Sequence, residues 1–213
     1  MRNFELVIFD CDGVLVDSER LCVRTEALIL ADLGWQLSES EIISRFSGRS
    51  PADMHREVEA HIGSEVDWDE VFEVRYKEVF DKELVAVPGI VKALDAIQIL
   101  TCVASSSTHA GIQYRLAKTG LLTKFEDRIF SAEDVARGKP APDVFLYAAQ
   151  AMGVDPRVCA VVEDSVFGVV AGIEAKMTVF GYSGSVTSSE MLTLAGAIAF
   201  DEMGELPDLL LGH

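Results

Sequence analysis

Short apolar runs alternate with amphipathic segments along most of the chain, and this alternation predicts an α/β fold. Runs typical of buried strands cover residues 4–10, 99–104, 158–162, 177–181 and 197–200, with a shorter one near 129–130. Segments with the apolar spacing of a helix cover residues 89–97, 108–119 and 142–152, and further helices are expected from 165 and after 202. Strands separated by helices indicate a Rossmann-like parallel sheet with helices on both faces.

One block breaks this alternation, because residues 18 to 83 follow a single strand and are almost entirely helical in pattern. Helix starts are expected at Ser18, at Ser38 or Ser40, at Ser50-Pro51 and at Asp67. We therefore expect an α/β catalytic core made of residues 1–15 and 84–213, with a helical cap of residues 16–83 inserted into it.

Two of the later helices have an apolar face that should pack on the sheet. In the helix over 142–152 this face is formed by Phe145, Ala148, Ala149 and Met152. In the helix from Ser165 it is expected to comprise Val166, Val169, Val170 and Ile173.

Composition excludes several classes of protein. The net charge of −17 argues against nucleic-acid binding, and it means that an anionic substrate needs local cations. No apolar run reaches the roughly 18 to 20 residues that span a bilayer, and no basic segment leads into an apolar signal region at the start. We expect a cytoplasmic protein whose four cysteines are reduced, with Cys11 turned away from the flanking aspartates.

Acidic pairs follow two of the predicted buried strands. Asp10 and Asp12 lie two residues apart, so their side chains share one face of an extended segment, which suits a nucleophile paired with a general acid/base. Taken alone, this Asp-x-Asp-Gly motif also fits a turn or a calcium loop. Glu163 and Asp164 follow the strand at 158–162, and they fit either metal binding or a favourable helix N-terminus.

Two further segments fit phosphate chemistry. Ser105-Ser106-Ser107 lies between a strand and a helix, where hydroxyl and backbone N–H groups form a phosphate cradle or simply cap the helix. Lys139 lies between Gly138 and Pro140, an unusual setting for a plain surface lysine. In a parallel sheet the carboxyl ends of the strands share one edge, so we expect Asp10, Ser105, Lys139 and Asp164 to converge there.

The set DCDGVLVDSE, VASSS, GKPAPD and VVEDS, in this order and with a helical insert after the first, resembles the haloacid dehalogenase (HAD) superfamily. It is most similar to the branch that contains β-phosphoglucomutase, phosphoglycolate phosphatase and 6-phosphogluconate phosphatase. The resemblance implies that Asp10 is a nucleophile forming an aspartyl-phosphate and that Asp12 is the general acid/base. It further implies that Ser105, with Ser106 beside it, holds phosphoryl oxygens and that Lys139 stabilises negative charge.

The resemblance also implies a Mg²⁺ cofactor. Its ligands would be Asp10, the backbone carbonyl of Asp12 and Asp164, with Glu163 orienting a metal-bound water or Lys139. An all-oxygen site next to a phosphate suits magnesium.

Within the family, an acid at position 12 disfavours dehalogenase and phosphonatase activity. The mutase carries an arginine where this chain has Pro51, with Arg49 displaced from that position, and a lysine where it has Thr108. We therefore expect a Mg²⁺-dependent phosphatase that acts as a monomer on a small phosphorylated metabolite, a sugar phosphate or sugar-acid phosphate. The alternatives are a β-phosphoglucomutase-like phosphomutase and a non-catalytic protein that binds phosphorylated ligands. Candidate cap residues for the substrate are Arg49, Arg75 and Lys77.

Overall fold

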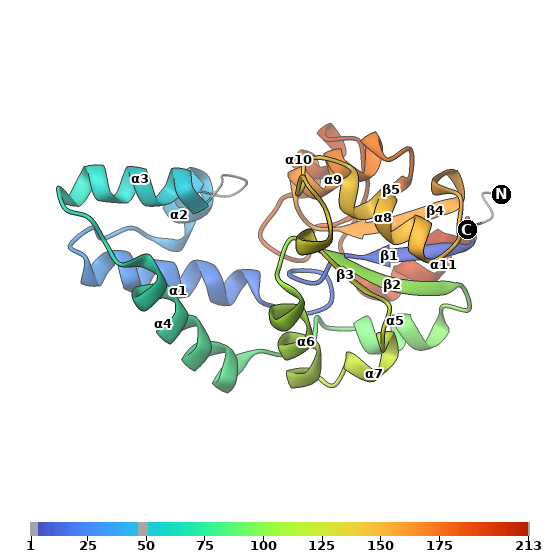
Figure 1. Cartoon of the computed structure of the whole chain (residues 1–213), viewed down its shortest axis with the longest axis horizontal. Coiled ribbons are helices and arrows are strands. Elements are labelled where there is room, and N and C mark those ends of the chain that lie inside the picture. The colour runs from blue at the N-terminus through green and yellow to red at the C-terminus, as the bar shows by residue number, and fades with distance from the viewer. Residues whose placement is uncertain (1–3, 47–50, 213) are drawn as a thin grey trace. The chain divides into compact units, whose positions relative to one another are not determined.

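The computed structural model describes residues 4–46 and 51–212. The chain divides into two compact units, one of Met1–Asp17 with Val85–His213 and one of Ser18–Leu84 (Figure 1). The first contains the sheet and is called the α/β unit here, and the second is the helical unit.

Six parallel strands form the sheet of the α/β unit in the order β3-β2-β1-β4-β5-β6. Their bounds are β1 Leu6–Phe9, β2 Leu100–Ser105, β3 Ile129–Ser131, β4 Cys159–Glu163, β5 Thr178–Tyr182 and β6 Ile198–Phe200. The predicted α/β fold with a parallel sheet is therefore confirmed.

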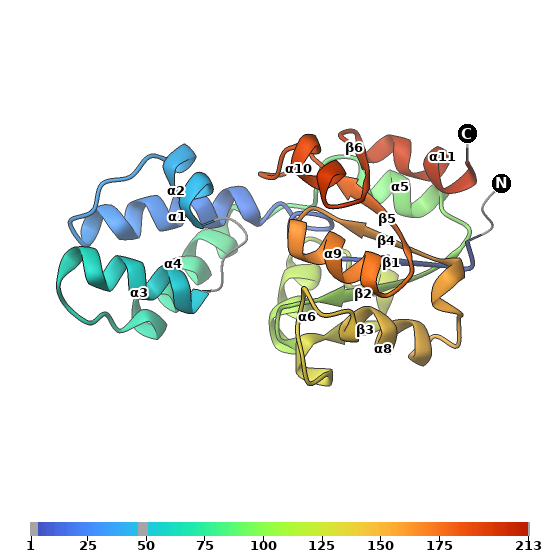
Figure 2. The ribbon, with the colours of Figure 1, turned by 90° about the horizontal axis from the view of Figure 1, so that it is seen from above.

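Helices flank this sheet on two sides, with α5 and α11 on one and α8 and α9 on the other (Figure 2). The helices of the unit are α5 Ile90–Ala96, α6 His109–Lys118, α7 Leu122–Phe125, α8 Asp143–Ala151, α9 Val166–Glu174, α10 Ser189–Leu194 and α11 Leu206–Leu211. Short 3-10 helices cover Ala132–Asp134, Pro156–Val158 and Met203–Glu205. The apolar pattern did not predict α7 or α10, which are only one or two turns long.

Alternate strand residues point to opposite faces, so the sheet supports two apolar layers. On one face Leu6, Ile8 and Val161 pack with Phe145 and Ala148 of α8, as expected for that helix. On the other, the ring of Phe9 meets that of Phe125 edge-on at a centroid distance of 6.2 Å.

Helix α9 packs differently from its predicted face. Its buried residues are Gly168, Val169, Ala171 and Gly172, whereas Ile173 is 39% exposed. A Cβ atom at Gly172 would lie 2.6 Å from Cγ2 of Val179 on β5, so the glycine permits close approach of helix and strand. The prediction is confirmed for Val169 but wrong for Ile173, because it took large apolar residues rather than small ones as the mark of the packed face.

The strand register brings the sequence motifs to one edge. Phe9 is level with Val103 of β2 and with Val162 of β4, and the Asp10 amide donates to the Val162 carbonyl at 2.9 Å. The strands before β4 lie on one side of β1, and β4 to β6 lie on the other. The direction of the strand order therefore changes between β1 and β4. Open α/β sheets bind ligands in the crevice at such a point.

Both connections to the helical unit run side by side at the edge of the α/β unit. Val16 and Ala86 form an isolated antiparallel bridge. The Asp17 amide donates to the Val85 carbonyl at 2.9 Å, and the Val87 amide donates to the Leu15 carbonyl at 3.0 Å. The chain therefore leaves and re-enters the α/β unit at one place.

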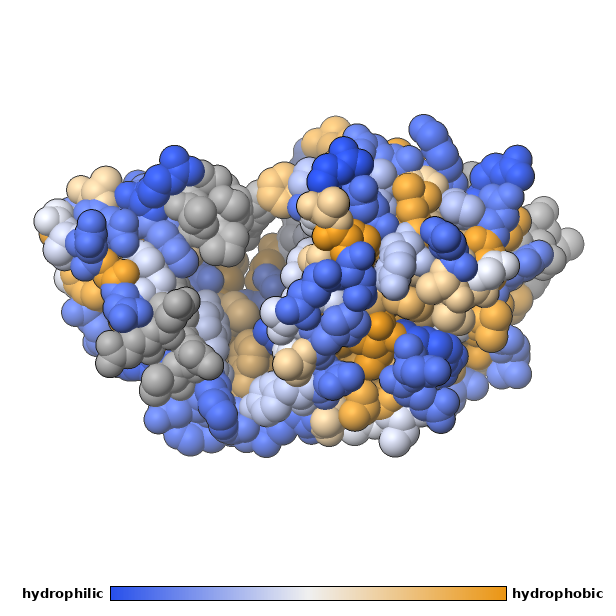
Figure 3. Space-filling model, viewed as in Figure 1, coloured by the Kyte–Doolittle hydropathy of each residue, from blue (hydrophilic) through white to orange (hydrophobic). Residues whose placement is uncertain are grey.

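The helical unit consists of α1 Glu19–Asp32, α2 Glu39–Phe46, α3 Pro51–Ile62 and α4 Trp68–Glu83. Helix α1 packs against both α2 and α4. Two histidine–tryptophan stacks add to the packing of the helical unit. His55 stacks on Trp68 at 4.1 Å and His61 stacks on Trp35 at 4.0 Å, measured between ring centroids. Hydrophilic side chains are widespread on the surface of each unit, in line with the high net charge (Figure 3).

No helix in the described part of the chain has both the length and the apolar character needed to cross a membrane. All four cysteines are free thiols, as predicted, and Cys11, Cys102 and Cys159 are buried.

Candidate active site

A buried ammonium group stands at the carboxyl edge of the sheet. Nζ of Lys139 donates to Oδ1 of Asp10 at 2.6 Å, to Oε1 of Glu163 at 2.6 Å and to the Ala104 carbonyl at 3.1 Å. These three acceptors match the three protons of an ammonium group. The Lys139 side chain is only 4% exposed, and its Nζ also lies 4.7 Å from the centroid of the Phe145 ring.

Burial and charge set the protonation of this cluster in opposite directions. Burial raises the pKa of Asp10 to about 7, and Lys139 opposes that rise while the carboxylates of Glu163 and Asp12 add to it. Burial alone would lower the pKa of Lys139, but Asp10 and Glu163 outweigh it and raise the pKa above its ordinary value. The lysine is thus held as a cation between two acids.

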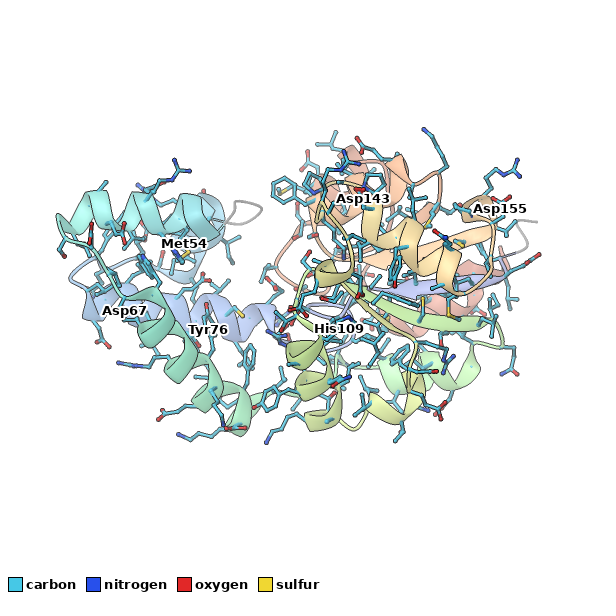
Figure 4. The ribbon with its side chains drawn as sticks, viewed as in Figure 1. Met54, Asp67, Tyr76, His109, Asp143 and Asp155 are labelled. Atoms are coloured by element: carbon cyan, nitrogen blue, oxygen red, sulfur yellow. The ribbon has the colours of Figure 1, made fainter. Side chains whose placement is uncertain are left out.

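The loop that carries Lys139 is closed by an ion pair at its ends. Nη2 of Arg137 donates to Oδ1 of Asp143 at 3.0 Å, and Asp143 is the first residue of α8, where an acid favours the helix dipole (Figure 4). The Lys139–Pro140 peptide bond is cis.

Glu163 is fixed by the start of α9. Its Oε2 accepts from the Ser165 amide at 3.0 Å and from the Ser165 hydroxyl at 2.8 Å, while Oε1 takes Lys139. A Cβ atom at Gly168 would lie 1.8 Å from the Glu163 carboxyl carbon, so only glycine leaves room for this carboxylate. Both oxygens of Glu163 are thus hydrogen-bonded to protein groups. This carboxylate is better placed to hold Lys139 than to coordinate a metal ion directly.

Three buried carboxylates at this edge could hold a metal ion. One oxygen each from Asp10, Glu163 and Asp164 lie within 4.8 Å of one another. Gly13, at φ +73°, faces Asp164: a Cβ atom there would lie 1.9 Å from Oδ2 of Asp164. The donor set is all oxygen and anionic, which fits a hard divalent cation.

The carboxylate of Asp12 belongs to a different set of contacts from that of Asp10. Its Oδ2 accepts from the Ser107 hydroxyl at 3.0 Å, and its Oδ1 lies 3.2 Å from Nε of Arg115 on α6. The two aspartates that share one motif therefore meet different partners.

The serine run divides among several roles. Ser105 is buried at the end of β2, and its hydroxyl accepts from the Ser107 amide at 3.1 Å. Ser106 is exposed in the turn before α6. Helix α6 is capped by Thr108, whose hydroxyl accepts from the Gly111 amide, so Ser105 and Ser106 are not needed as caps.

Candidate cap residues of the helical unit have other partners or lie outside the described residues. Arg75 pairs with Asp32 at 2.5 Å and Lys77 pairs with Asp81 at 2.9 Å. Arg49 lies outside the residues that the structure describes.

Sequence reasoning missed Ser107 and Arg115 as partners of Asp12. Ser107 was visible as the third serine of the run. Arg115 carried a weaker signal, a glycine at position 111, one turn earlier in a segment that is otherwise helical in pattern.

Comparisons with known proteins agree with this geometry. The family model of haloacid dehalogenase-like hydrolases matches residues 4–176. The chain is 33% identical over 212 residues to the 6-phosphogluconate phosphatase of Escherichia coli strain K12. The matched region covers 98% of this chain and 96% of that relative.

Two solved structures are similar over almost their whole length. A conserved haloacid dehalogenase-like protein of unknown function from Agrobacterium tumefaciens has a TM-score of 0.91 and 33% identity, covering 99% of each chain. A HAD family hydrolase from Deinococcus radiodurans, with bound phosphate and sodium, has a TM-score of 0.85 and 29% identity, covering 100% of this chain and 97% of that chain. This chain therefore belongs to the haloacid dehalogenase-like hydrolases.

Proposed function

We propose that this protein is a phosphatase that hydrolyses a small phosphorylated metabolite through an aspartyl-phosphate on Asp10. The observation that carries the proposal is the division of labour between two acids of one motif. Asp10 is buried against a lysine at the edge of the sheet, and Asp12 is held separately by Ser107 and Arg115. Such a pair suits a nucleophile and a proton-transfer group.

In the first step, a carboxylate oxygen of Asp10 bonds to phosphorus while the bond from phosphorus to the ester oxygen breaks. Asp12 gives its proton to that departing oxygen, so an alcohol leaves and an acyl phosphate remains. In the second step, Asp12 takes a proton from water as the water oxygen bonds to phosphorus. The bond from phosphorus to Asp10 then breaks, which yields inorganic phosphate and restores both aspartates.

The surrounding cations and hydroxyls support this chemistry. Lys139 lies 2.6 Å from Asp10 and stabilises negative charge on the transferring group and on the nucleophile. Ser105 and the turn that includes Ser106 offer hydroxyl and N–H donors to phosphoryl oxygens at the same edge.

We infer that the divalent cation is Mg²⁺, held by Asp10 and Asp164 and by the backbone carbonyl of Asp12. Glu163, whose oxygens already serve Lys139 and Ser165, would support the site from behind. When bound, the cation would offset the repulsion between the carboxylates and a phosphate dianion. It would also counter the effect of burial, which raises the pKa of Asp10.

For the substrate we propose a sugar phosphate or sugar-acid phosphate. The support is the 33% identity to a 6-phosphogluconate phosphatase over 98% of the chain. The helical unit would supply the groups that recognise the part of the substrate beyond the phosphate, with Arg49 the first candidate. A domain of this kind that closes over the site would exclude water during attack.

The test is phosphate release from a panel that includes 6-phosphogluconate, hexitol phosphates, sugar phosphates and phosphoglycolate, with and without Mg²⁺. We expect one or more members to be hydrolysed only with Mg²⁺, and we expect Asp10→Asn to abolish release while the variant still folds. Turnover that survives Asp10→Asn would refute the nucleophile. Conversion of β-glucose 1-phosphate to glucose 6-phosphate faster than phosphate release would instead identify a phosphomutase.

A further inference from the structure

The two oxygens of the Asp12 carboxylate meet different groups: a hydroxyl donates a hydrogen bond to one, and a guanidinium lies within ion-pair distance of the other. Ser107 donates to Oδ2 at 3.0 Å, and Nε of Arg115 lies 3.2 Å from Oδ1. The side chains of Asp12 and Arg115 are only 19% and 21% exposed, whereas the Arg75–Asp32 pair of the helical unit is 48% and 62% exposed. The Nε and Nη1 atoms of Arg115 are themselves buried. This is a largely desolvated pair rather than a surface contact.

A glycine makes room for that guanidinium. Gly111 precedes Arg115 by four residues on α6, so the two lie on one face of the helix. A Cβ atom at Gly111 would lie 2.9 Å from Nη1 of Arg115 and 3.2 Å from the Thr108 hydroxyl. Glycine inside a helix costs about 0.8–1.0 kcal/mol relative to alanine. The position of Arg115 gives a reason for the glycine that helix formation does not.

We propose that Arg115 is a positioning residue that orients the Asp12 carboxyl group for proton transfer to the leaving oxygen. This inference rests on the proposed phosphatase function and adds a residue that the sequence motifs do not contain. The planar guanidinium has a fixed donor geometry and remains charged, so it restricts the rotation of the Asp12 side chain more than a lysine would. In this role Arg115 acts through Asp12.

Leaving-group dependence separates this role from a purely structural one. An alkoxide needs a proton as it departs, whereas p-nitrophenolate departs readily without one. The ratio kcat/KM reports only the steps up to departure of the alcohol, so later hydrolysis of the acyl phosphate does not obscure it. A misplaced Asp12 should therefore lower kcat/KM for alkyl phosphates and spare p-nitrophenyl phosphate.

The experiment compares the best sugar phosphate of the panel with p-nitrophenyl phosphate for the wild type and Arg115→Met. General acid catalysis contributes about 10²–10⁴-fold, and partial loss through misorientation should lower kcat/KM for the sugar phosphate by about 10-fold or more. The value for p-nitrophenyl phosphate should change by less than about threefold. Arg115→Lys should recover part of the loss.

Two further variants guard against misfolding and loss of charge. Gly111→Ala removes no buried group, yet its Cβ displaces the guanidinium, and it should show a smaller loss of the same selectivity. Lys118→Gln, an exposed charge at the end of the same helix, should leave both substrates unaffected. Equal losses on both substrates, or no loss on either, would overturn the role of Arg115 alone. A wild type that hydrolyses neither ester would overturn the proposed function as well.

Discussion

The buried Lys139 cluster of the α/β unit contrasts with the ion pairs of the helical unit, although the α/β unit also has exposed pairs such as Arg157–Asp155. In the α/β unit, Lys139 is 4% exposed and bridges Asp10 and Glu163, which are 11% and 1% exposed. Among the described residues of the helical unit, the ion pairs are on the surface: Arg24–Glu83, Arg45–Glu57, Arg75–Asp32 and Lys77–Asp81.

The difference in burial predicts how well each ion pair tolerates substitution. A buried charge removed from its partner is strongly unfavourable, so the α/β cluster constrains each of its members. An exposed pair contributes about 0–1 kcal/mol, so the helical unit can change its surface charges at little cost.

The largest expected effect comes from removing the buried cation. Lys139→Met leaves two buried carboxylates facing each other and should lower the free energy of unfolding by about 3–5 kcal/mol. It should also lower phosphate release by about 10²–10³-fold. Chemical denaturation and a phosphate assay measure the two effects. Lys77→Met in the helical unit is the matched control, with a change within about 1 kcal/mol. Equal stabilities for the two variants would remove the distinction between the units.

The next largest effect is expected from replacing, by alanine, either of two glycines whose backbone is in the left-handed region. The substitutions are at Gly13 (φ +73°) and Gly34 (φ +89°). Each should lower the free energy of unfolding by about 1–2 kcal/mol, because alanine strains the backbone there. Only at Gly13 would the new Cβ meet a carboxylate, Oδ2 of Asp164, and none of the described atoms lies within 4 Å of a Cβ at Gly34.

Gly13→Ala should therefore raise the Mg²⁺ concentration needed for half-maximal activity by about 10–100-fold. The rise in Tm on adding Mg²⁺ should shrink with it, and Gly34→Ala should keep the wild-type response in both measurements. A normal Mg²⁺ response in Gly13→Ala would mean that Asp164 is not a ligand.

A smaller effect is expected from the aromatic packing of the helical unit. The rings of His55 and Trp68 stack at 4.1 Å with an interplanar angle of 7°. His55→Leu keeps an apolar side chain but removes the stack, and should cost about 0.5–1.5 kcal/mol. Thermal unfolding measures the loss, and the ratio of kcat/KM for the sugar phosphate to kcat/KM for p-nitrophenyl phosphate should stay at the wild-type value. A change in that ratio would show that the helical unit influences the chemical step.

The smallest effect concerns the half-buried Glu26, which accepts a hydrogen bond from Tyr76 at 3.0 Å (Figure 4 labels Tyr76). Burial raises the pKa of Glu26 above its ordinary value of 4.5, although the Tyr76 hydrogen bond lowers it in part. The folded state thus keeps this proton to higher pH than the unfolded state. The associated stability is complete below about pH 4.5 and is lost as the pH rises through the folded-state pKa.

Glu26→Gln should remove this pH dependence and stabilise the protein near pH 7 by a few tenths to about 1 kcal/mol. Near pH 4 the variant and the wild type should be alike, because both then carry an uncharged group. Denaturation curves at the two pH values provide the measurement. A variant that is less stable at pH 7 would indicate that the carboxylate form is the favoured one.

The sequence predicted the sheet and the residues at its edge because both follow from local pattern. Apolar runs mark the strands, and parallel strands bring their carboxyl ends together, so Asp10, Glu163 and Asp164 could be expected to meet. Their individual roles remain predictions.

Contacts that depend on close packing could not be predicted in this way. The face of α9 was misassigned in part, because the glycines Gly168 and Gly172 meet the sheet and Ile173 does not. The pairing of Asp12 with Arg115 joins residues about a hundred positions apart, and no periodicity encodes it. The sequence showed Ser107 as part of the serine run, but its contact with Asp12, like that of Arg115, depends on how the start of α6 packs beside the first motif.

The paired backbone contacts at Val16 and Ala86 bear on how such a protein could diversify. The bridge between Val16 and Ala86 holds the two ends of the insert close together within the α/β unit. Loop-closure entropy grows only logarithmically with length, and lengthening or exchanging the insert adds little cost. Exchange of residues 18–84 between relatives would thus move the helical unit as one segment, while the buried contacts of Lys139 with Asp10 and Glu163 stay in the recipient.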